Sequence, residues 1–308
     1  MSSRLIDTLV LTAAPSSGDL TQGIVDNVCT ALSDAGAEGV WLAPGAAWEI
    51  DVNLDRSEAT DAQRLAETAA GTAAVDVNIV SAPKTSRRKR LLCADMESTI
   101  IREELIDEMA EMVGCRAEIA AITGAAMRGE IDFEGALVQR VALFKGFAAN
   151  KLDDILSRAT LMAGAATLLR TMRASGAKCA LVSGGFTHFA EPIARRLGFD
   201  TVVANELVIE NDKLTGDVRQ PIVGPQGKAD ALAHLAAEHG LDLSETLAVG
   251  DGANDLVMLR TAGLGVAFRA KPILAAAARS SPSGAVIAHA DLTALLYLQG
   301  FPATAIQA

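Results

Sequence analysis

Short apolar runs alternate with amphipathic stretches from the start of the chain to about residue 84. Their order is strand, helix, strand, strand, helix, strand, which is typical of a split βαβ sandwich with two helices over one sheet. We predict a small α+β domain over residues 1–84. It contains no acid–base pair, glycine-rich loop or metal cluster, so a packing or regulatory role is favoured. The expected strands are Leu5–Thr12, Glu38–Pro44, Ala47–Val52 and Ala73–Ser81, and the expected helices are Gly18–Ala35 and Thr60–Ala70.

From residue 85 onward the pattern changes to continuous apolar runs separated by helical stretches. Continuous apolar strands that alternate with helices indicate a parallel sheet buried on both faces. We therefore predict an α/β domain over residues 85–308, in which a ligand binds beyond the carboxyl ends of the strands. The expected strands are Leu91–Ala94, Lys178–Val182, Thr201–Ala204, Thr246–Val249 and Leu264–Ala267.

Two segments interrupt this alternation. The connection between the first two strands is too long for one helix, and residues 102–160 carry helical patterning, as at Leu105, Met109 and Met112. We predict that this segment forms a helical cap over the ligand crevice. The second segment, Glu206–Val218, contains turn signals between short apolar runs and predicts a β-hairpin.

Charge narrows the classes of function. The 308 residues include 27 Lys and Arg against 38 Asp and Glu, and the net charge of −11 provides no field that would hold a polyanion. A nucleic-acid partner is therefore not expected. We interpret the basic run before the first strand of the second domain as a solvated linker. This run consists of Lys84, Arg87, Arg88, Lys89 and Arg90.

Membrane and zinc-hydrolase classes are also disfavoured. No apolar run approaches the ~18 residues that a membrane span needs, and Asp7 interrupts the apolar N-terminal stretch, unlike in a signal peptide. The four cysteines, Cys29, Cys93, Cys115 and Cys179, form no CxxC pair, and the histidines form no HExxH pair. We expect no membrane association, a cytoplasmic location and reduced thiols.

Acidic residues follow two of the expected strands. Asp95 comes directly after the first, and Asp251 and Asp255 follow the fourth. If these strands are neighbours, the three carboxylates meet at one point and repel one another. A hard divalent cation with oxygen ligands is an economical way to hold them together, and Mg²⁺ is favoured because it is bound by a few carboxylates together with phosphate oxygens.

Groups suited to an anion follow another strand. Ser183 supplies a hydroxyl, and Gly184 and Gly185 let backbone N–H groups approach an anion closely. Lys228, at the start of an expected helix, adds a positive charge. A metal, a hydroxyl, amides and a lysine are the groups that stabilise a phosphoryl group in transfer.

These residues stand in four ordered motifs. In sequence and order the motifs resemble those of the haloacid dehalogenase (HAD) superfamily of phosphohydrolases and, within it, the phosphoserine phosphatases. The resemblance covers residues from about 90 to 280 and implies a HAD-like, Rossmann-like core with a helical cap. The motifs are Asp95-Met96-Glu97-Ser98-Thr99, Ser183-Gly184-Gly185-Phe186, Lys228 and Gly250-Asp251-Gly252-Ala253-Asn254-Asp255.

The resemblance implies a role for each motif residue. It makes Asp95 the nucleophile that forms an aspartyl-phosphate, and Glu97 the general acid and base. It implies that Mg²⁺ is bound by an Asp95 oxygen, the backbone carbonyl of Glu97 and Asp251, with Asp255 behind them and Asn254 nearby. The residues implied to hold the phosphoryl group are Ser183, Gly184, Gly185 and Lys228.

One motif position departs from the family. The residue two places after the nucleophile is usually aspartate, whereas Glu97 reaches about one methylene further. A backbone carbonyl as metal ligand is unaffected by this change. The acid–base geometry is affected, and a displacement of ~1 Å at a reacting group can cost ~100-fold in rate. We expect the loop or the Glu97 rotamer to compensate.

The cap supplies the implied substrate contacts. Glu104 and Arg140 match the positions that meet the ammonium and carboxylate of phosphoserine, and Phe133 and Met127 match the apolar residues that close over the site. The implied reaction is hydrolysis of O-phospho-L-serine to L-serine and phosphate, the last step of serine biosynthesis.

Other interpretations stay open. The same residues could serve a phosphatase of another small phosphomonoester, or a phosphotransferase with an acceptor such as homoserine. A signalling receiver also combines acidic residues, a hydroxyl and a lysine, but the helical insertion and Glu97 argue against it. By its layout, the N-terminal domain resembles the ACT domains, which implies serine binding or a role in a homodimer.

Overall fold

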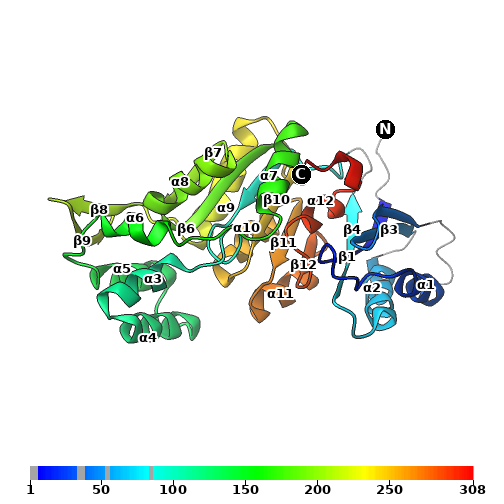
Figure 1. The fold of residues 1–308 in the computed structure, drawn as a ribbon, viewed down its shortest axis with the longest axis horizontal. Helices are drawn as coiled ribbons and strands as arrows, with labels where there is room; N and C mark the ends of the chain where they lie inside the picture. The colour runs from blue at the N-terminus through cyan, green and yellow to red at the C-terminus, as the bar shows by residue number, and fades with distance from the viewer. Residues whose placement is uncertain (1–5, 33–38, 53–55, 83–85, 308) are drawn as a thin grey trace.

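The structure, a computed structural model, describes residues 6–32, 39–52, 56–82 and 86–307. Figure 1 shows an elongated molecule, with a mainly helical cap at one end and a small sheet with two helices at the other. A six-stranded sheet lies between them. In the described ranges, no helix is both long and apolar enough to cross a lipid bilayer.

The N-terminal sheet is antiparallel, with the strand order β2-β3-β1-β4. Helices α1 and α2 cover one face, where Leu9 and Leu11 of the central strand pack with Val28 and Ala66. The predicted order of elements is confirmed, although Leu5, Glu38 and Ala35 lie outside the described residues. The elements are β1 (Ile6–Ala13), α1 (Gln22–Ala31), β2 (Val40–Ala43), β3 (Ala47–Val52), α2 (Arg56–Ala70) and β4 (Val75–Ala82).

The second sheet is parallel, with the order β12-β11-β10-β5-β6-β7. The five predicted strands are confirmed. The sixth, β12, was not predicted because it is four residues long, begins with glycine and alanine and follows a segment rich in serine. The strands are β5 (Leu91–Ala94), β6 (Lys178–Phe186), β7 (Thr201–Asn205), β10 (Thr246–Gly250), β11 (Leu264–Phe268) and β12 (Gly284–Ile287).

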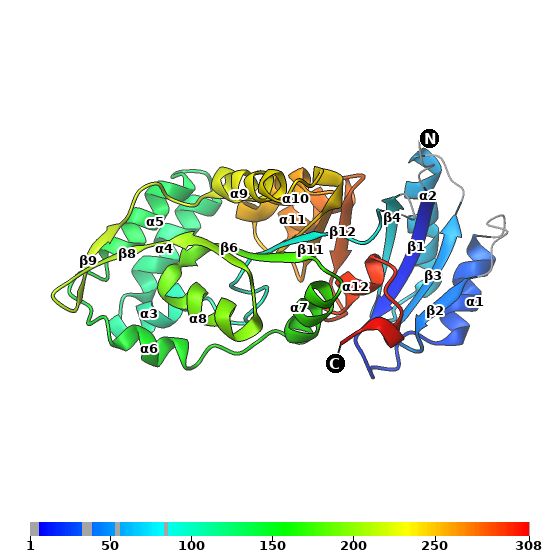
Figure 2. The ribbon, with the colours of Figure 1, turned by 90° about the horizontal axis from the view of Figure 1, so that it is seen from above.

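Helices cover both faces of this sheet (Figure 2). On one face, α7 (Ala165–Ala174), α8 (Thr187–Leu197) and α12 (Ala294–Leu298) contribute to the largest apolar core. The other face packs against a separate cluster of side chains from three further helices. These are α9 (Pro225–Glu238), α10 (Leu256–Thr261) and α11 (Pro272–Arg279).

The predicted cap is a group of four helices between β5 and β6. The predicted hairpin, β8 (Leu207–Glu210) and β9 (Lys213–Val218), belongs to the same lobe, because Gly146 N–H donates to Leu214 O (2.8 Å) and Leu214 N–H to Phe147 O (2.9 Å). The cap is therefore formed by two separate segments of the chain, the four helices and the hairpin. The helices are α3 (Leu105–Val113), α4 (Arg116–Met127), α5 (Phe133–Ala142) and α6 (Lys151–Leu156).

Buried polar contacts join the two sheets at their edges. Asn78 of β4 donates through Nδ2 to Val286 O (2.9 Å) and accepts from Val286 N–H (2.7 Å), as a neighbouring strand would. Asp76 accepts N–H bonds from Ala288, His289 and Ala290. The N-terminal sheet is thus fixed to β12 and the loop after it.

The expectation of a solvated basic linker is wrong at Arg87 and Lys89, whereas Arg88 and Arg90 are exposed. Arg87 pairs with Glu49 (2.6 Å) and donates to Leu298 O (3.0 Å), Arg88 stacks over the ring of Phe301, and Lys89 is buried. Long side chains with apolar stems can tie two units together in this way. Lys84 lies outside the described residues.

Candidate active site

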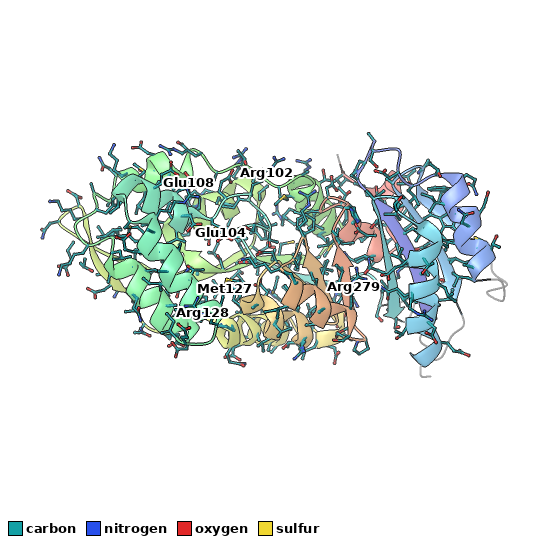
Figure 3. All side chains as sticks on the ribbon, turned by 90° about the horizontal axis from the view of Figure 1, so that it is seen from below. Arg102, Glu104, Glu108, Met127, Arg128 and Arg279 are labelled. Carbon is teal, nitrogen blue, oxygen red and sulfur yellow. The ribbon has the colours of Figure 1, made fainter. Side chains whose placement is uncertain are left out.

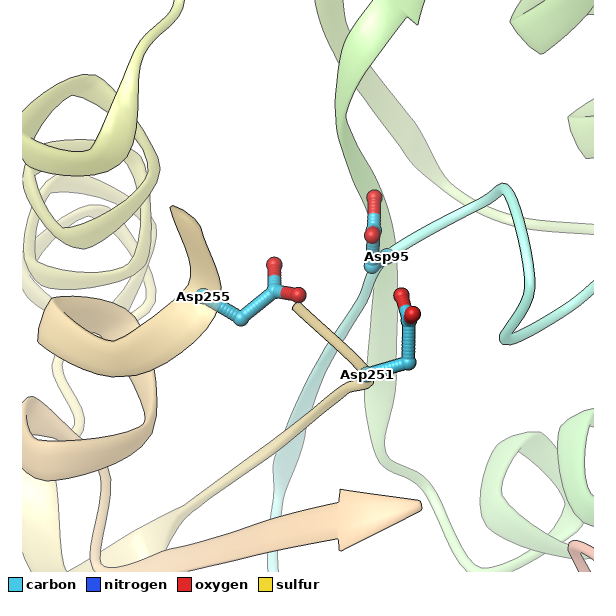
Figure 4. Close-up of side chains that lie close together, drawn as sticks. All are labelled: Asp95, Asp251 and Asp255. Atoms are coloured by element: carbon cyan, nitrogen blue, oxygen red, sulfur yellow. The ribbon is translucent and has the colours of Figure 1, made fainter. Parts of the chain in front are cut away.

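Three carboxylates meet at the carboxyl ends of β5 and β10 (Figure 4). Asp95 follows β5 and Asp251 follows the neighbouring strand β10, while Asp255 ends the turn that leads into α10. Each of the three offers an oxygen within 4.8 Å of the other two, and all three side chains are buried. The structure therefore brings together the acidic residues that the strand ends predicted.

The absence of a side chain at Gly250 leaves room for the Asp255 carboxylate in this cluster. A Cβ atom on Gly250 would lie 2.3 Å from Cγ of Asp255, so a larger residue there would displace the carboxylate. The N–H of Gly252 donates to Oδ2 of Asp255 (3.0 Å). The fourth motif thus folds back so that its last aspartate faces its first residues.

Lys228 is the buried cation of the site. Its Nζ lies 2.8 Å from Oδ1 of Asp95 and 2.6 Å from Oδ1 of Asp255. Burial opposes the charged ammonium, but these two carboxylates overcome it and raise the pKa of Lys228 above its ordinary value. Lys228 occupies the first turn of α9, where a positive charge faces the positive end of the helix dipole, so its position is set by the carboxylates.

One buried ammonium does not balance three carboxylates. Burial, and then the charge of Asp255, raise the pKa of Asp95 to about 7. Burial also raises the pKa of Asp251 to about 6, and Asp255 acts in the same direction. Lys271, at 3.5 Å from Asp251, is more exposed and opposes the shift only in part. A compact set of oxygen donors with excess negative charge fits a hard divalent cation, so this cluster can hold a metal ion.

Ser183 and the two glycines after it lie within the last residues of β6. The hydroxyl of Ser183 accepts the N–H of Gly185 (2.9 Å), which fixes the turn beside Asp95's strand. The carbonyl of Gly184 accepts a hydrogen bond from Asn205 (2.9 Å). Asn254 is close by, since a Cβ atom on Gly184 would lie 3.8 Å from its Nδ2 atom.

Asn205 belongs to the site's framework and was missed in the sequence. It is buried at the end of β7 and also bonds to both the N–H (2.7 Å) and the carbonyl (3.3 Å) of Val223. It therefore ties the Ser183 turn to the segment before α9, which carries Lys228. Its place as a polar residue directly after an apolar strand was the signal that could have identified it.

Glu97 faces the start of the cap. Its Oε1 accepts the N–H of Leu105 (2.7 Å), the first residue of α3, and Oε2 lies 2.9 Å from where a Cβ of Gly185 would be. Burial, and then the charge of Glu104, raise the pKa of Glu97 to about 8. A carboxyl group with this pKa carries its proton at neutral pH.

The charged residues predicted for substrate recognition also come close to the site. Glu104 is the N-cap residue of α3 and accepts a hydrogen bond from Ser98 (2.8 Å). Arg140 of α5 is half-buried, and burial lowers its pKa, while Glu97 and Glu104 act in the opposite direction. A carboxylate and a guanidinium from two cap helices thus act electrostatically on the same region.

Phe133 and Met127, the two apolar residues predicted to close over the site, differ in their contacts. The ring of Phe133 packs over backbone, because Cβ atoms on Gly184 and Gly224 would lie 3.0 Å and 3.3 Å from it. Met127 is 72% exposed. Figure 3 shows it at the end of α4, on the side of the cap toward the sheet domain. The structure therefore places Phe133, but not the Met127 side chain, in packing contact beside the Ser183 turn.

Comparison with known proteins adds an independent observation. The model of the haloacid dehalogenase-like hydrolase family matches residues 92–260, which is more than half of the chain. The chain belongs to this family. It is also 48% identical over 189 residues to a phosphoserine phosphatase of Lactococcus lactis, of which the match covers 88%, together with 61% of this chain.

Two further HAD relatives extend the likeness. Phosphoserine phosphatase SerB2 of Mycobacterium tuberculosis is 44% identical over 234 residues, which is 76% of this chain but only 56% of that protein. This chain therefore spans little more than half of that relative's length. A solved structure described as a phospho-aspartyl intermediate analogue of phosphoserine phosphatase superposes with a TM-score of 0.63, at 37% identity, over 68% of this chain and 98% of that one. The HAD core and the phosphoserine phosphatase subfamily predicted from the motifs are confirmed.

Proposed function

We propose that this chain is a Mg²⁺-dependent phosphoserine phosphatase, which hydrolyses O-phospho-L-serine to L-serine and phosphate through an aspartyl-phosphate. The observation that carries the proposal is the orientation of the Asp95 carboxylate, which two contacts fix. Its Oδ1 accepts the N–H of Met96 (2.8 Å) and faces Lys228 (2.8 Å). These contacts hold the group in one orientation and leave Oδ2 as the attacking atom. The curated names of the relatives and the solved phospho-aspartyl analogue support this reading.

The metal site follows from the same cluster. Asp95, Asp251 and the backbone carbonyl of Glu97 are the ligands we propose for Mg²⁺, and Asp255 orients Lys228 behind them. When bound, Mg²⁺ neutralises the repulsion between the Asp95 carboxylate and the anionic substrate. The excess negative charge of the cluster supports this assignment.

In the first step, Oδ2 of Asp95 attacks phosphorus and the bond from phosphorus to the serine oxygen breaks. The proton of the Glu97 carboxyl group moves to that oxygen, so serine leaves as an alcohol. Lys228, the Ser183 hydroxyl and the backbone N–H of Gly184 stabilise the charge on the phosphoryl oxygens. The raised pKa of Glu97, about 8, supports its role as the acid.

In the second step, a water molecule attacks the phosphorus of the aspartyl-phosphate. Glu97, now a carboxylate, takes a proton from this water, and the bond between phosphorus and Asp95 breaks. Phosphate is released, and Asp95 and Glu97 return to their starting states. One carboxyl group thus serves as acid and then as base.

Substrate choice rests on the cap. We assign Glu104 to the ammonium and Arg140 to the carboxylate of phosphoserine, because opposite charges on two helices match an amino-acid zwitterion. Phe133 shields the reacting centre from water, and Met127 covers it from the rim when substrate is bound. Asn254, near the Ser183 turn, adds a polar contact on the phosphate side.

We assign residues 1–84 to an ACT-like packing or regulatory domain and residues 85–308 to the phosphatase, with its cap at about 102–160. Serine binding at the N-terminal domain and a homodimer are roles that fit its layout. All four cysteines are free, which supports our assignment to a reducing compartment such as the cytoplasm.

The test is steady-state release of phosphate from L-phosphoserine, with and without Mg²⁺, against phosphothreonine, phosphoethanolamine and 3-phosphoglycerate. We expect preference for phosphoserine, strict dependence on Mg²⁺ and a loss of at least about 10⁴-fold in Asp95→Asn, in which the nucleophile is absent. Preference for another ester would overturn the substrate, and phosphate passed to added homoserine would overturn hydrolysis. Uptake of one phosphate without turnover would point to a receiver.

A further inference from the structure

Glu97 and Ser98, which follow the proposed nucleophile in the same loop, each make a hydrogen bond to the start of the cap. Glu97 accepts the N–H of Leu105 (2.7 Å), and the hydroxyl of Ser98 donates to Oε1 of Glu104 (2.8 Å). Glu104 is the N-cap residue of α3, yet its side chain makes no capping bond. Glu97 accepts the first N–H of the helix, while the Glu104 carboxylate makes no bond to the helix terminus and is available for another task.

Ser98 keeps this contact at a conformational cost. Its φ is +53°, in the left-handed region that disfavours residues with a Cβ atom. Glycine would remove this cost but would also remove the hydroxyl. The strained backbone aims Oγ at Glu104 from the loop that directly follows Asp95, so it joins the catalytic loop to the cap.

We infer that Ser98 is a positioning residue that sets amino-group specificity by holding the Glu104 carboxylate. This inference rests on the proposed function. Because Oε1 of Glu104 is taken by the Ser98 hydroxyl, Oε2 is the oxygen that accepts from the substrate ammonium. Fixing one oxygen restricts the rotamers of a long side chain before substrate arrives, and such preorganisation strengthens binding.

The test compares two esters that differ only at the amino group. One is L-phosphoserine, and the other is 3-(phosphonooxy)propanoate, which carries hydrogen in place of the amino group. In Ser98→Ala we expect kcat/KM for phosphoserine to fall about tenfold, mainly through KM, as for the loss of one charge-assisted hydrogen bond. For the second ester, kcat/KM of Ser98→Ala should stay within roughly twofold of the wild-type value. If this ester is not turned over, its inhibition constant should stay within the same range.

Two further variants separate the hydroxyl from the backbone. Ser98→Gly relieves the φ of +53° and should lose the same selectivity without a lower melting temperature. Ser157→Ala removes an exposed hydroxyl of the same cap, which donates to Asp154 O (2.7 Å), and should change neither ester.

Equal losses on both esters would overturn the inference in favour of a general structural role, and so would an unchanged preference in Ser98→Ala. Both outcomes leave the proposed function standing, provided that the wild type prefers phosphoserine. A wild type that does not distinguish the two esters overturns the assignment of Glu104, and the role of Ser98 with it.

Discussion

Asp76 and Asp251 are both buried aspartates, 5% and 6% exposed, but their surroundings differ. Asp76 joins the N-terminal sheet to the loop after β12 and accepts the N–H groups of Ala288, His289 and Ala290. Asp251 stands at the end of β10 beside other carboxylates. Burial raises the pKa of both groups. The N–H groups around Asp76 oppose the rise. At Asp251, Lys271 opposes it, whereas Asp255 and Glu104 add to it.

This difference in surroundings distinguishes a buried carboxylate with a structural role from one at a candidate functional site. A buried carboxylate that is surrounded by N–H donors is stabilised by the fold itself. A buried carboxylate among other carboxylates destabilises the fold until a cation binds, and such sites are where catalysis is found. The junction also contains Asn78 and Arg87 with their bonds to backbone. At the candidate active site, burial and then the charge of Glu104 raise the pKa of Glu97.

A large effect is expected at Glu97, on the side of this comparison that belongs to the candidate active site. Glu97→Gln removes the proton donor and should lower kcat for phosphoserine by about 10²–10⁴-fold, because general acid–base catalysis contributes that much. Glu97→Asp should keep a substantial part of the activity, since it restores the residue usual in the family. Wild-type kcat should fall as pH rises above about 8, where the acid loses its proton.

Steady-state phosphate release from pH 6 to 10 checks this prediction, with melting temperatures as the control for folding. Near-equal turnover of wild type and Glu97→Gln would refute the acid–base role. A profile that is flat through pH 9 would show that another group supplies the proton.

A smaller effect concerns Lys89, on the junction side. Lys89 is buried and donates to Ser244 O (2.7 Å), and burial lowers its pKa to about 8. Below pH 8 the ammonium is charged in both states and the fold bears the full cost of burying it. Between about pH 8 and 10.5 only the unfolded chain keeps the proton, so stability rises with pH by at most about 3 kcal/mol.

Urea unfolding of wild type and Lys89→Met at pH 7.5 and pH 10 measures this contribution. The difference in unfolding free energy, wild type minus variant, should increase with pH. A difference that is constant or decreases would mean that Lys89 keeps its ordinary pKa in the folded protein.

Much of the fold follows from local patterns in the sequence. Five of the six parallel strands were predictable from continuous apolar runs, the cap from helical periodicity and the hairpin from turn signals. Asp95 and Asp251 were predictable as site residues because polar residues at the carboxyl ends of parallel strands converge. These arguments need no knowledge of distant contacts.

Other features depend on contacts between distant segments. The bonds of Asn78 with Val286 and the pairing of Arg87 with Glu49 join residues that no periodicity relates. The basic run was therefore wrongly interpreted as solvated at Arg87 and Lys89. The bond from Glu97 to Leu105 likewise depends on how the cap is placed. Long-range pairing of this kind is specified by the tertiary fold.

The most direct test of this account compares Asp76→Asn with Asp251→Asn in a single experiment. Melting temperature is measured in EDTA, and phosphoserine turnover per folded enzyme is measured in Mg²⁺. Asp76→Asn should lower the free energy of unfolding by about 1–3 kcal/mol, because N–H bonds to a carboxylate are lost. Turnover should be preserved. Asp251→Asn should leave the melting temperature equal or higher and abolish turnover. Equal destabilisation by both variants, or full turnover in Asp251→Asn, would contradict the account.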